Sequence, residues 1–251
     1  MIGKCYICNT PAGRYHYNVD SVYSIIKCTQ CGLEYTHPVP SNITLESFYS
    51  NYLDVRANPE IVRLNAEANL KILATYGWSH QSKLLDFGAG KGIFVETAGK
   101  NAFGMDLQPS LNPRIHNALD TFKCKQWDFI TLYGVLEHLS SPLQIMTTLA
   151  SLLRQGGIMA ITTVNAEGII PYYYKPPEHL TYWTRSSFEI MSKYCNMKII
   201  KYSPYEMYQL GSVYFERLLS RTPELYRQCI YNNLPRIVSV PTNEIMCILR
   251  K

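Results

Sequence analysis

Short apolar runs alternate with stretches of helical spacing in the central part of the chain. Each run has four to seven residues, too few for a core helix, which favours buried strands. The runs cover residues 84–87, 102–106, 127–132 and 158–164. Helical stretches lie between them, from Ile93 to Ala98 and from Ser141-Pro142 to a stop at Gly156-Gly157. This alternation predicts an α/β fold with a parallel sheet and helices on both faces.

The two ends of the chain predict further elements. Asn58-Pro59 begins a helix that Gly77 ends. Residues 197–202 and 244–249 predict a closing strand pair, and the tyrosine-rich segment 206–236 between them predicts a mostly helical insertion. We therefore expect three parts, which are a module at residues 1–40, a helical linker at 41–80 and a doubly wound, Rossmann-like sheet domain at 81–251.

Composition places the chain among globular proteins. Of its 251 residues, 47% are hydrophobic and 17% charged, which is enough apolar material for a sizeable core and too much for a disordered tail. No apolar run approaches the roughly 18 residues of a membrane helix, and the start lacks a secretion signal, so we expect a soluble, cytoplasmic protein without membrane contact. The formal net charge is −1 over residues 1–60, +1 over 61–190 and +5 over 191–251. The N-terminal part thus lacks the basic surface typical of nucleic-acid-binding modules.

Four of the eight cysteines form two closely spaced pairs, Cys5 with Cys8 and Cys28 with Cys31. Two such C-x-x-C pairs are typical of a zinc ribbon, because each pair turns two sulfurs toward one tetrahedral ion. Two disulfides are disfavoured without a secretion signal, and a redox-active pair is disfavoured without a neighbouring βαβ pattern. Four thiolates around Zn²⁺ carry net negative charge and would repel phosphate. We therefore expect zinc to stabilise the module rather than to bind nucleic acid.

A glycine-rich loop, Asp86-Phe87-Gly88-Ala89-Gly90-Lys91-Gly92, connects the strand at 84–87 to the next helix. Such a loop brings backbone N–H groups and a helix N-terminus toward a ligand. A Walker loop is excluded because Gly92 follows Lys91 where Ser or Thr is required. A dinucleotide fingerprint is disfavoured because Ile93 takes the place of its third small residue.

This loop resembles the first motif of class I S-adenosylmethionine (SAM) methyltransferases, in which an acidic strand-end residue precedes G-x-G-x-G. Val135-Leu136-Glu137-His138 is similar to the segment after the fourth strand of that family, and residues 177–184 are similar to the segment after the fifth. The cysteine pairs, followed by Pro40-Ser41 and residues 48–52, resemble a subgroup with a fused zinc ribbon. The resemblance implies a class I methyltransferase domain at 81–251.

The resemblance also implies a set of SAM-binding residues. SAM carries no phosphate but has an ammonium and a sulfonium group, so carboxylates take the place of groups that grip phosphate. Asp86 would hold the amino-acid end of SAM, and Asp106, twenty residues further on, would accept hydrogen bonds from the ribose hydroxyls. The expected SAM-contacting residues are Asp86, Gly88, Ala89, Gly90, Gly92, Asp106, Leu107, Leu132 and Tyr133.

Two histidines, His138 and His179, are the candidate catalytic bases. Methyl transfer needs a base only when the acceptor is a hydroxyl, a thiol or an acidic carbon. Each histidine has a structural alternative, which is to join its loop to a neighbouring element. Tyr172, Tyr173 and Tyr174 would line an acceptor pocket or pack beneath a lid, and Tyr49 and Tyr52 would cover the SAM carboxylate.

The resemblance implies a small polar acceptor, such as a sugar or a nucleotide-sugar, methylated on oxygen or carbon. An RNA methyltransferase is one alternative, because zinc ribbons are also fused to enzymes that modify ribosomal RNA. The charge of the N-terminal part disfavours it. A non-catalytic scaffold is a second alternative, disfavoured because the glycine loop and both aspartates are intact.

Overall fold

A computed structural model describes residues 4–11, 13–50, 58–122, 126–168, 174–218 and 234–251. Its main feature is a seven-stranded sheet in the order β10-β11-β8-β7-β4-β5-β6. The strands are β4 (Leu84–Phe87), β5 (Ala102–Met105), β6 (Ile115–His116), β7 (Trp127–Tyr133), β8 (Leu153–Val164), β10 (Lys198–Leu210) and β11 (Ile237–Arg250). Strands β4 to β8 are parallel, and β11 pairs antiparallel with both β8 and β10. The α/β sheet and the closing strand pair predicted from the sequence are confirmed.

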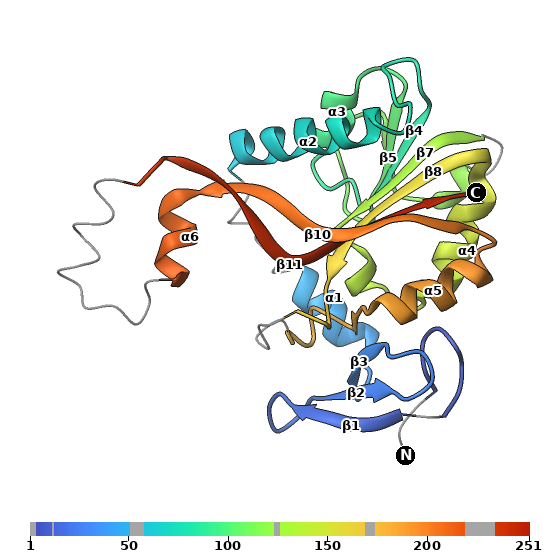
Figure 1. The fold of residues 1–251 in the computed structure, drawn as a ribbon, viewed down its shortest axis with the longest axis vertical. Helices are drawn as coiled ribbons and strands as arrows, with labels where there is room; N and C mark the ends of the chain where they lie inside the picture. Colours follow the sequence, from blue (N-terminus) through green and yellow to red (C-terminus); the bar gives the residue numbers. More distant parts are fainter. Residues whose placement is uncertain (1–3, 12, 51–57, 123–125, 169–173, 219–233) are drawn as a thin grey trace.

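Helices cover both faces of this sheet (Figure 1). Helices α2 (Pro59–Ala74) and α3 (Ile93–Ala98) lie on one face, and α4 (Pro142–Leu152) and α5 (Arg185–Tyr194) lie on the other. The remaining helices are α1 (Asn42–Ser50), α6 (Gly211–Leu218) and two short 3-10 helices, η1 (Leu119–Phe122) and η2 (Leu136–His138). Within the described part of the chain, no helix has both the length and the apolar character needed to cross a membrane.

Helix α2 begins where the sequence predicts. The side chain of Asn58 accepts a hydrogen bond from the Glu60 N–H at 3.0 Å, and Pro59 occupies the first turn, where its missing N–H is not needed. The C-terminal end is followed by Gly77, whose φ of +92° is readily adopted by glycine.

The N-terminal module is an antiparallel sheet of β1 (Gly13–Asn18), β2 (Ser24–Cys28) and β3 (Glu34–His37). A fourth strand, β9 (Thr181–Tyr182), comes from the segment after β8 and pairs with β3. Apolar side chains of the module, including Ile7 and Leu33, share one buried cluster with Trp183. Because β9 follows the carboxyl end of β8, the module lies at the carboxyl edge of the large sheet (Figure 1).

Two predicted boundaries differ from the structure. Helix α4 ends at Leu152 rather than at Gly156-Gly157, because Leu153 pairs with Trp127 and so begins β8. Strand β10 continues to Leu210, which pairs with Ile237. The start of the predicted helical insertion is therefore strand, followed by the helix α6. Residues 219–233 of that insertion lie outside the described residues.

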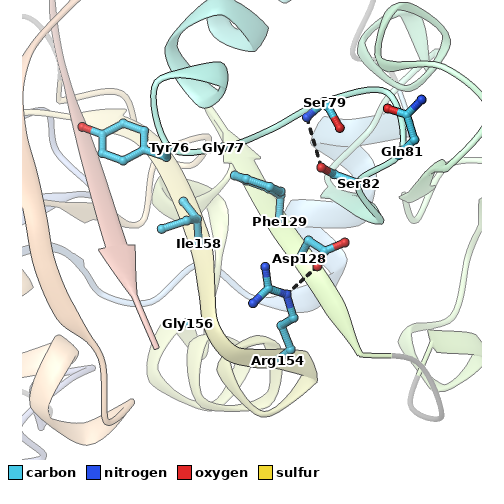
Figure 2. A pocket seen from close by; sticks show the side chains of 10 residues that line it. All are labelled: Tyr76, Gly77, Ser79, Gln81, Ser82, Asp128, Phe129, Arg154, Gly156 and Ile158. Carbon is cyan, nitrogen blue, oxygen red and sulfur yellow. Dashed lines mark hydrogen bonds and ion pairs between the residues drawn. The ribbon is translucent and has the colours of Figure 1, made fainter.

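A cavity of about 310 Å³ lies at the amino ends of β7 and β8 (Figure 2). Asp128 and Arg154, which are joined by an ion pair, line it together with Tyr76 and Ile158. Open α/β sheets bind their ligands at the opposite, carboxyl edge of the strands. The active site is therefore expected at the glycine loop and not in this cavity.

Candidate active site

The glycine loop follows the carboxyl end of β4 and leads into α3. Gly88 has a φ of +82°, and a Cβ built on it would lie 2.3 Å from Cγ2 of Val135 in the loop after β7. Gly92 has a φ of +84°, and its Cβ would lie 2.5 Å from Cδ1 of Ile115 in β6. The missing side chains therefore let the glycine loop pack closely against both neighbouring segments.

Several backbone N–H groups of this loop already have partners inside the protein. Those of Gly88 and Ala89 donate to the carbonyl oxygen of Met105 at 2.7 and 3.0 Å. The N–H of Gly92 donates to the carbonyl of Ala89 at 2.9 Å. A loop that cradles phosphate presents such N–H groups to its ligand. This loop suits a ligand recognised by carboxylates better than a phosphate.

Asp86 is a buried carboxylate at the end of β4. Its Oδ1 accepts a hydrogen bond from the hydroxyl of Thr131 in β7 at 2.6 Å. Burial, together with the nearby charge of Asp106, raises the pKa of Asp86 to about 7, although the Thr131 hydrogen bond opposes the shift. A ligand ammonium group would relieve this penalty, because it would pair with the charged form of the carboxylate.

Asp106 follows β5 and connects it to the glycine loop. Its Oδ2 accepts a hydrogen bond from the Gly90 N–H at 2.7 Å, and its Oδ1 accepts one from the Gln108 N–H at 2.9 Å. A carboxylate has about four acceptor positions, so two are left for a ligand diol. The structure therefore brings together the two aspartates and the glycine loop that the sequence selects.

The other expected SAM-contacting residues have different surroundings. The side chain of Leu107 is 80% exposed, beside Asp106. Leu132 is fully buried in the hydrophobic core, so its side chain contacts other core residues. Tyr133 packs edge-on against Phe94, and its buried hydroxyl has no hydrogen-bond partner among the described residues. This hydroxyl lies within reach of the charge of Asp86 and is available to donate a hydrogen bond to a bound ligand.

The two candidate catalytic histidines lie side by side, with ring centroids 5.0 Å apart. His138 ends η2, and His179 is buried in the segment after β8. The Nδ1–H of His138 donates to the carbonyl oxygen of Glu178 at 2.8 Å. Glu137 lies in the same cluster and accepts a hydrogen bond from the hydroxyl of Thr163 at 2.7 Å. The segments after β7 and β8 therefore meet at this group.

A protein-family model described as a methyltransferase domain matches residues 55–201. The chain belongs to this methyltransferase family. A search of curated protein sequences finds no match.

Solved structures share the fold of this methyltransferase. A SAM-dependent methyltransferase from Archaeoglobus fulgidus is 17% identical, with a TM-score of 0.52 over 84% of this chain and 100% of its own. The 1,6-didemethyltoxoflavin-N1-methyltransferase of Burkholderia thailandensis, solved with 1,6-didemethyltoxoflavin and S-adenosylhomocysteine, is 14% identical, with a TM-score of 0.52 over 95% of this chain and 99% of its own. Family and fold together identify a class I SAM-dependent methyltransferase.

The methyltransferase also gathers the four paired cysteines into one cluster. The Sγ atoms of Cys5 and Cys31 are 3.4 Å apart, and those of Cys8 and Cys28 are 3.5 Å apart. Sulfurs of a tetrahedral zinc site, with bonds of about 2.3 Å, lie about 3.8 Å from one another. The cluster is therefore close to the geometry that a zinc ion requires.

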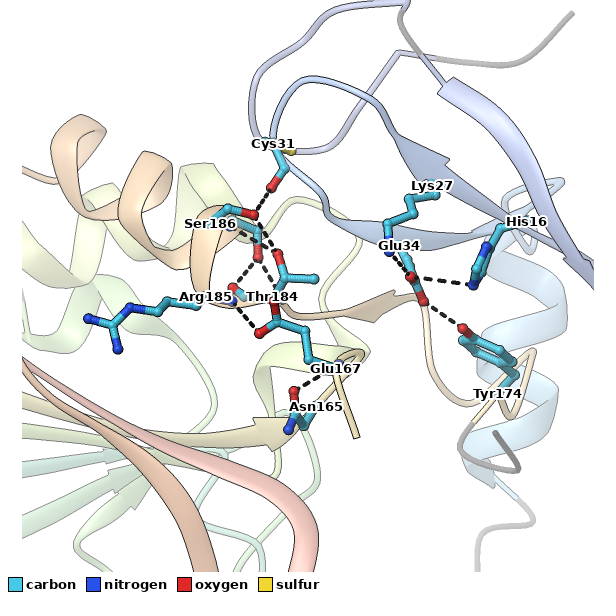
Figure 3. Close-up of polar contacts among 11 residues, drawn as sticks. His16, Lys27, Cys31, Glu34, Asn165, Glu167, Tyr174, Thr184, Arg185 and Ser186 are labelled. Atoms are coloured by element: carbon cyan, nitrogen blue, oxygen red, sulfur yellow. Dashed lines mark hydrogen bonds and ion pairs between the residues drawn. The ribbon is translucent and has the colours of Figure 1, made fainter. Parts of the chain in front are cut away.

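Hydrogen bonds join this cysteine-bearing module to the segment after β8, in which His179 also lies (Figure 3). The hydroxyl of Ser186 donates to the carbonyl of Cys31 at 2.9 Å. Glu34 of β3 is only 1% exposed; its carboxylate pairs with Lys27 at 2.7 Å and accepts a hydrogen bond from the hydroxyl of Tyr174 at 2.6 Å. Burial and the charge of Glu34 raise the pKa of Tyr174, so this hydroxyl stays protonated and keeps donating.

Tyr174 is the one predicted acceptor-pocket tyrosine that the structure describes, and its hydroxyl contacts Glu34. Tyr172, Tyr173 and Tyr52 lie outside the described residues, as does the side chain of Tyr49.

Sequence reasoning overlooked three polar residues of the methyltransferase site, namely Thr131, Glu137 and Thr163. Thr131 and Thr163 lie inside apolar strands, where they look like ordinary strand residues until their partners, Asp86 and Glu137, are known. Glu137 was open to prediction, since it directly precedes His138 at the carboxyl end of β7.

Proposed function

We propose that this methyltransferase transfers the methyl group of SAM to an oxygen or carbon of a small polar acceptor, such as a sugar or nucleotide-sugar. The observation that carries the proposal is the meeting of Asp86, Asp106 and the glycine loop at the carboxyl edge of β4 and β5. Carboxylates at this edge suit the ammonium group and the ribose of SAM, whereas the loop is poorly suited to phosphate.

Each of the nine expected SAM-contacting residues has a proposed part in binding. Asp86 pairs with the ammonium group, and Asp106 accepts hydrogen bonds from the ribose hydroxyls. Gly88 and Gly90 keep the backbone free of side chains, and Ala89 and Gly92 belong to the same turn. Leu107 and Tyr133 border the cofactor, while Leu132 contributes through its backbone. Together these contacts orient the cofactor, and alignment supplies much of the acceleration in a displacement reaction.

His138 and His179 have the task of activating the acceptor. When SAM is bound, it supplies an electrophilic methyl group attached to a sulfonium. An acceptor hydroxyl or acidic carbon becomes a competent nucleophile once its proton is removed, and imidazoles titrate near neutral pH. His179 is the better placed base, because the module and the segment after β8 fix its backbone: its carbonyl accepts hydrogen bonds from the hydroxyls of Thr36 at 2.7 Å and Tyr182 at 3.2 Å.

The four clustered cysteines, Cys5, Cys8, Cys28 and Cys31, hold a zinc ion in this proposal. Their spacing in the sequence and their short sulfur–sulfur separations support it. The ion would stabilise the fold of a module with few strands. Because β3 of this module pairs with β9, a folded module also fixes the segment that contains His179.

The test is transfer of a labelled methyl group from SAM to a panel of sugars and nucleotide-sugars, with bulk RNA as a second substrate. We expect transfer to a member of the small-molecule panel, and we expect His179→Ala to abolish turnover while the affinity for SAM is unchanged. His80→Ala is the matched control, because His80 precedes β4 and its ring contacts the carbonyl of Ala98 at the end of α3. Methylation of RNA alone would contradict the proposed acceptor class.

A further inference from the structure

A second group of metal-binding side chains lies where the segments after β7 and β8 meet. Glu137, His138 and His179 each offer one ligand atom, and these atoms all lie within 4.8 Å of one another. The side chains of Glu137 and His179 are buried, at 4% and 7% exposed. One carboxylate and two imidazoles are a ligand set that Zn²⁺ and other divalent transition metals take in proteins, with positions left for substrate.

The hydrogen bond of His138 prepares its ring for a metal. Its Nδ1 lies 2.8 Å from the carbonyl oxygen of Glu178, which only accepts hydrogen bonds. Nδ1 therefore carries a hydrogen, and in the neutral ring Nε2 is the nitrogen with the metal-binding lone pair. Metal-ligating histidines commonly donate their second N–H to a backbone carbonyl in this way, which fixes the orientation of the ring.

The charges around the cluster favour a cation. The hydroxyl of Thr163 donates to Oε2 of Glu137, and within the described ranges no lysine or arginine forms an ion pair with this carboxylate. Oε1 of Glu178 lies 3.8 Å from Nε2 of His179. A buried carboxylate whose hydrogen-bond donor is a neutral hydroxyl can still pair with a cation.

We propose that Glu137, His138 and His179 bind a divalent transition-metal ion of the zinc class, and that this ion holds an oxygen of the acceptor. Ligand atoms about 2.0–2.1 Å from a tetrahedral ion lie about 3.3 Å apart, so the cluster contracts slightly on binding. Val135, two residues before Glu137, contacts the glycine loop, which places the ion beside the proposed SAM site.

This inference deepens the proposed function and rests on it for the reaction step. The bound ion lowers the pKa of an acceptor hydroxyl, whose proton leaves to solvent. The acceptor oxygen then forms a bond to the methyl carbon while the carbon–sulfur bond breaks, and the electron pair of that bond stays on sulfur. In this inference the two histidines activate the acceptor as metal ligands, which replaces the role of base given to them above. The acceptor class narrows to hydroxyl-bearing molecules, and the atom methylated is oxygen.

Cobalt is the probe for this site. Protein that carries one zinc per chain is titrated with Co²⁺ by calorimetry and by visible absorption, because nitrogen- and oxygen-ligated cobalt differs in spectrum from cobalt bound to four thiolates. The expected result is one further ion per chain with the nitrogen–oxygen spectrum. Glu137→Gln, His138→Gln and His179→Gln should each weaken binding roughly tenfold or more. His80→Gln, whose ring contacts the carbonyl of Ala98 away from the site, should bind as the wild type does.

Two results would overturn the inference: no cobalt beyond the cysteine site in the wild-type protein, or undiminished binding in the His138→Gln and His179→Gln variants. His138 is only half-buried, so its variant serves if the buried substitutions prevent folding. A parallel titration with SAM separates the two proposals. If SAM binds and cobalt does not, the metal site is contradicted and the proposed function stands. If cobalt binds and SAM does not, the proposed function is contradicted and the metal site stands.

Discussion

At the residue scale, the central observation is a carboxylate whose charged form is destabilised until a ligand arrives. Asp86 is buried, its pKa is raised to about 7, and it accepts its side-chain hydrogen bond from a neutral hydroxyl, that of Thr131. Proteins commonly retain such costly groups at functional sites. The same property makes the role of Asp86 measurable.

SAM binding should depend on pH through Asp86. Below pH 7 the carboxyl of the free protein is protonated, so binding of the ammonium group must release a proton. The affinity should therefore fall as the pH drops from 7 to about 5, by at most about tenfold per pH unit. Calorimetric titrations across this range measure the slope, and Asp86→Asn should bind weakly at every pH without that slope. If the SAM affinity of Asp86→Asn still falls steeply as the pH drops, the proton released on binding comes from a group other than Asp86.

The affinity for SAM should rise with pH, whereas the stability of the SAM-free protein should fall with pH. The pKa of Asp86 is raised from its ordinary 3.8 to about 7, so the folded chain holds this proton more tightly than the unfolded chain. The free energy of unfolding thus falls as the pH rises through that interval. At pH 8, thermal denaturation should show Asp86→Asn to be more stable than the wild type, by about 1–3 kcal/mol. Equal or lower stability of the variant would contradict the cost assigned to this carboxylate.

Gly88→Ala should damage both stability and SAM binding. The added Cβ would lie 2.3 Å from Val135, at a φ of +82°. Gly77→Ala is the matched control, because its φ of +92° is similar and nothing lies within 4 Å of its Cβ. Denaturation and SAM titration of both variants should show a loss of about 1 kcal/mol in the control, from backbone strain alone, and about 1–3 kcal/mol more in Gly88→Ala. Only Gly88→Ala should weaken SAM binding. Equal losses of stability in the two variants would contradict a close contact between residue 88 and Val135.

At the element scale, β9 joins two parts of the chain that the sequence presents as separate. It pairs with β3 through Tyr35 and Glu34, and the Thr36 N–H donates to the carbonyl of Leu180 at 3.0 Å. These contacts hold the segment that contains His179 against the N-terminal module. The module therefore contacts the segment of His179, on the proposed acceptor side of the site, through β9.

Loss of zinc should reduce turnover much more than it reduces the affinity for SAM. Cys31→Ser, which removes one sulfur ligand, should loosen β3 and the neighbouring His179 segment, so turnover should fall strongly. SAM binding should be nearly unchanged, because the glycine loop, Asp86 and Asp106 belong to the large sheet. Calorimetry and a methyl-transfer assay on the same preparations measure the two effects, with Cys195→Ser, a buried cysteine outside the cluster, as the control. Equal loss of SAM affinity and turnover would contradict this division of roles.

Local sequence signals specify the large sheet well but not the contacts between distant segments. The alternating apolar runs and the caps at Asn58 and Gly77 identify β4, β5, β7 and α2 almost to the residue. The outer half of β10 was missed because its partner, residues 237–241, is about thirty residues away, so no local period marks it. The β3–β9 pair joins residues about 145 positions apart, which no local pattern encodes.

At the scale of the whole molecule, the fold places three chemical groups along one edge. The glycine loop with its two aspartates follows β4 and β5, the Glu137–His138–His179 cluster follows β7 and β8, and the cysteine module covers the end of β8. The sequence predicts the first group and the cysteines because each is a compact motif. The sequence also selects His138 and His179, but it does not show that they lie together with Glu137, because this depends on the approach of two segments forty residues apart.

The most direct test of this account is a calorimetric titration of the zinc-loaded protein with SAM and with S-adenosylhomocysteine, beside Asp106→Asn. We expect both ligands to bind at one site per chain with micromolar affinity. The variant should bind about fivefold to tenfold more weakly, because it loses the acceptors for the ribose hydroxyls. Absence of binding in the wild type, or equal affinity in the variant, would contradict the assignment of the glycine loop and Asp106 to the cofactor.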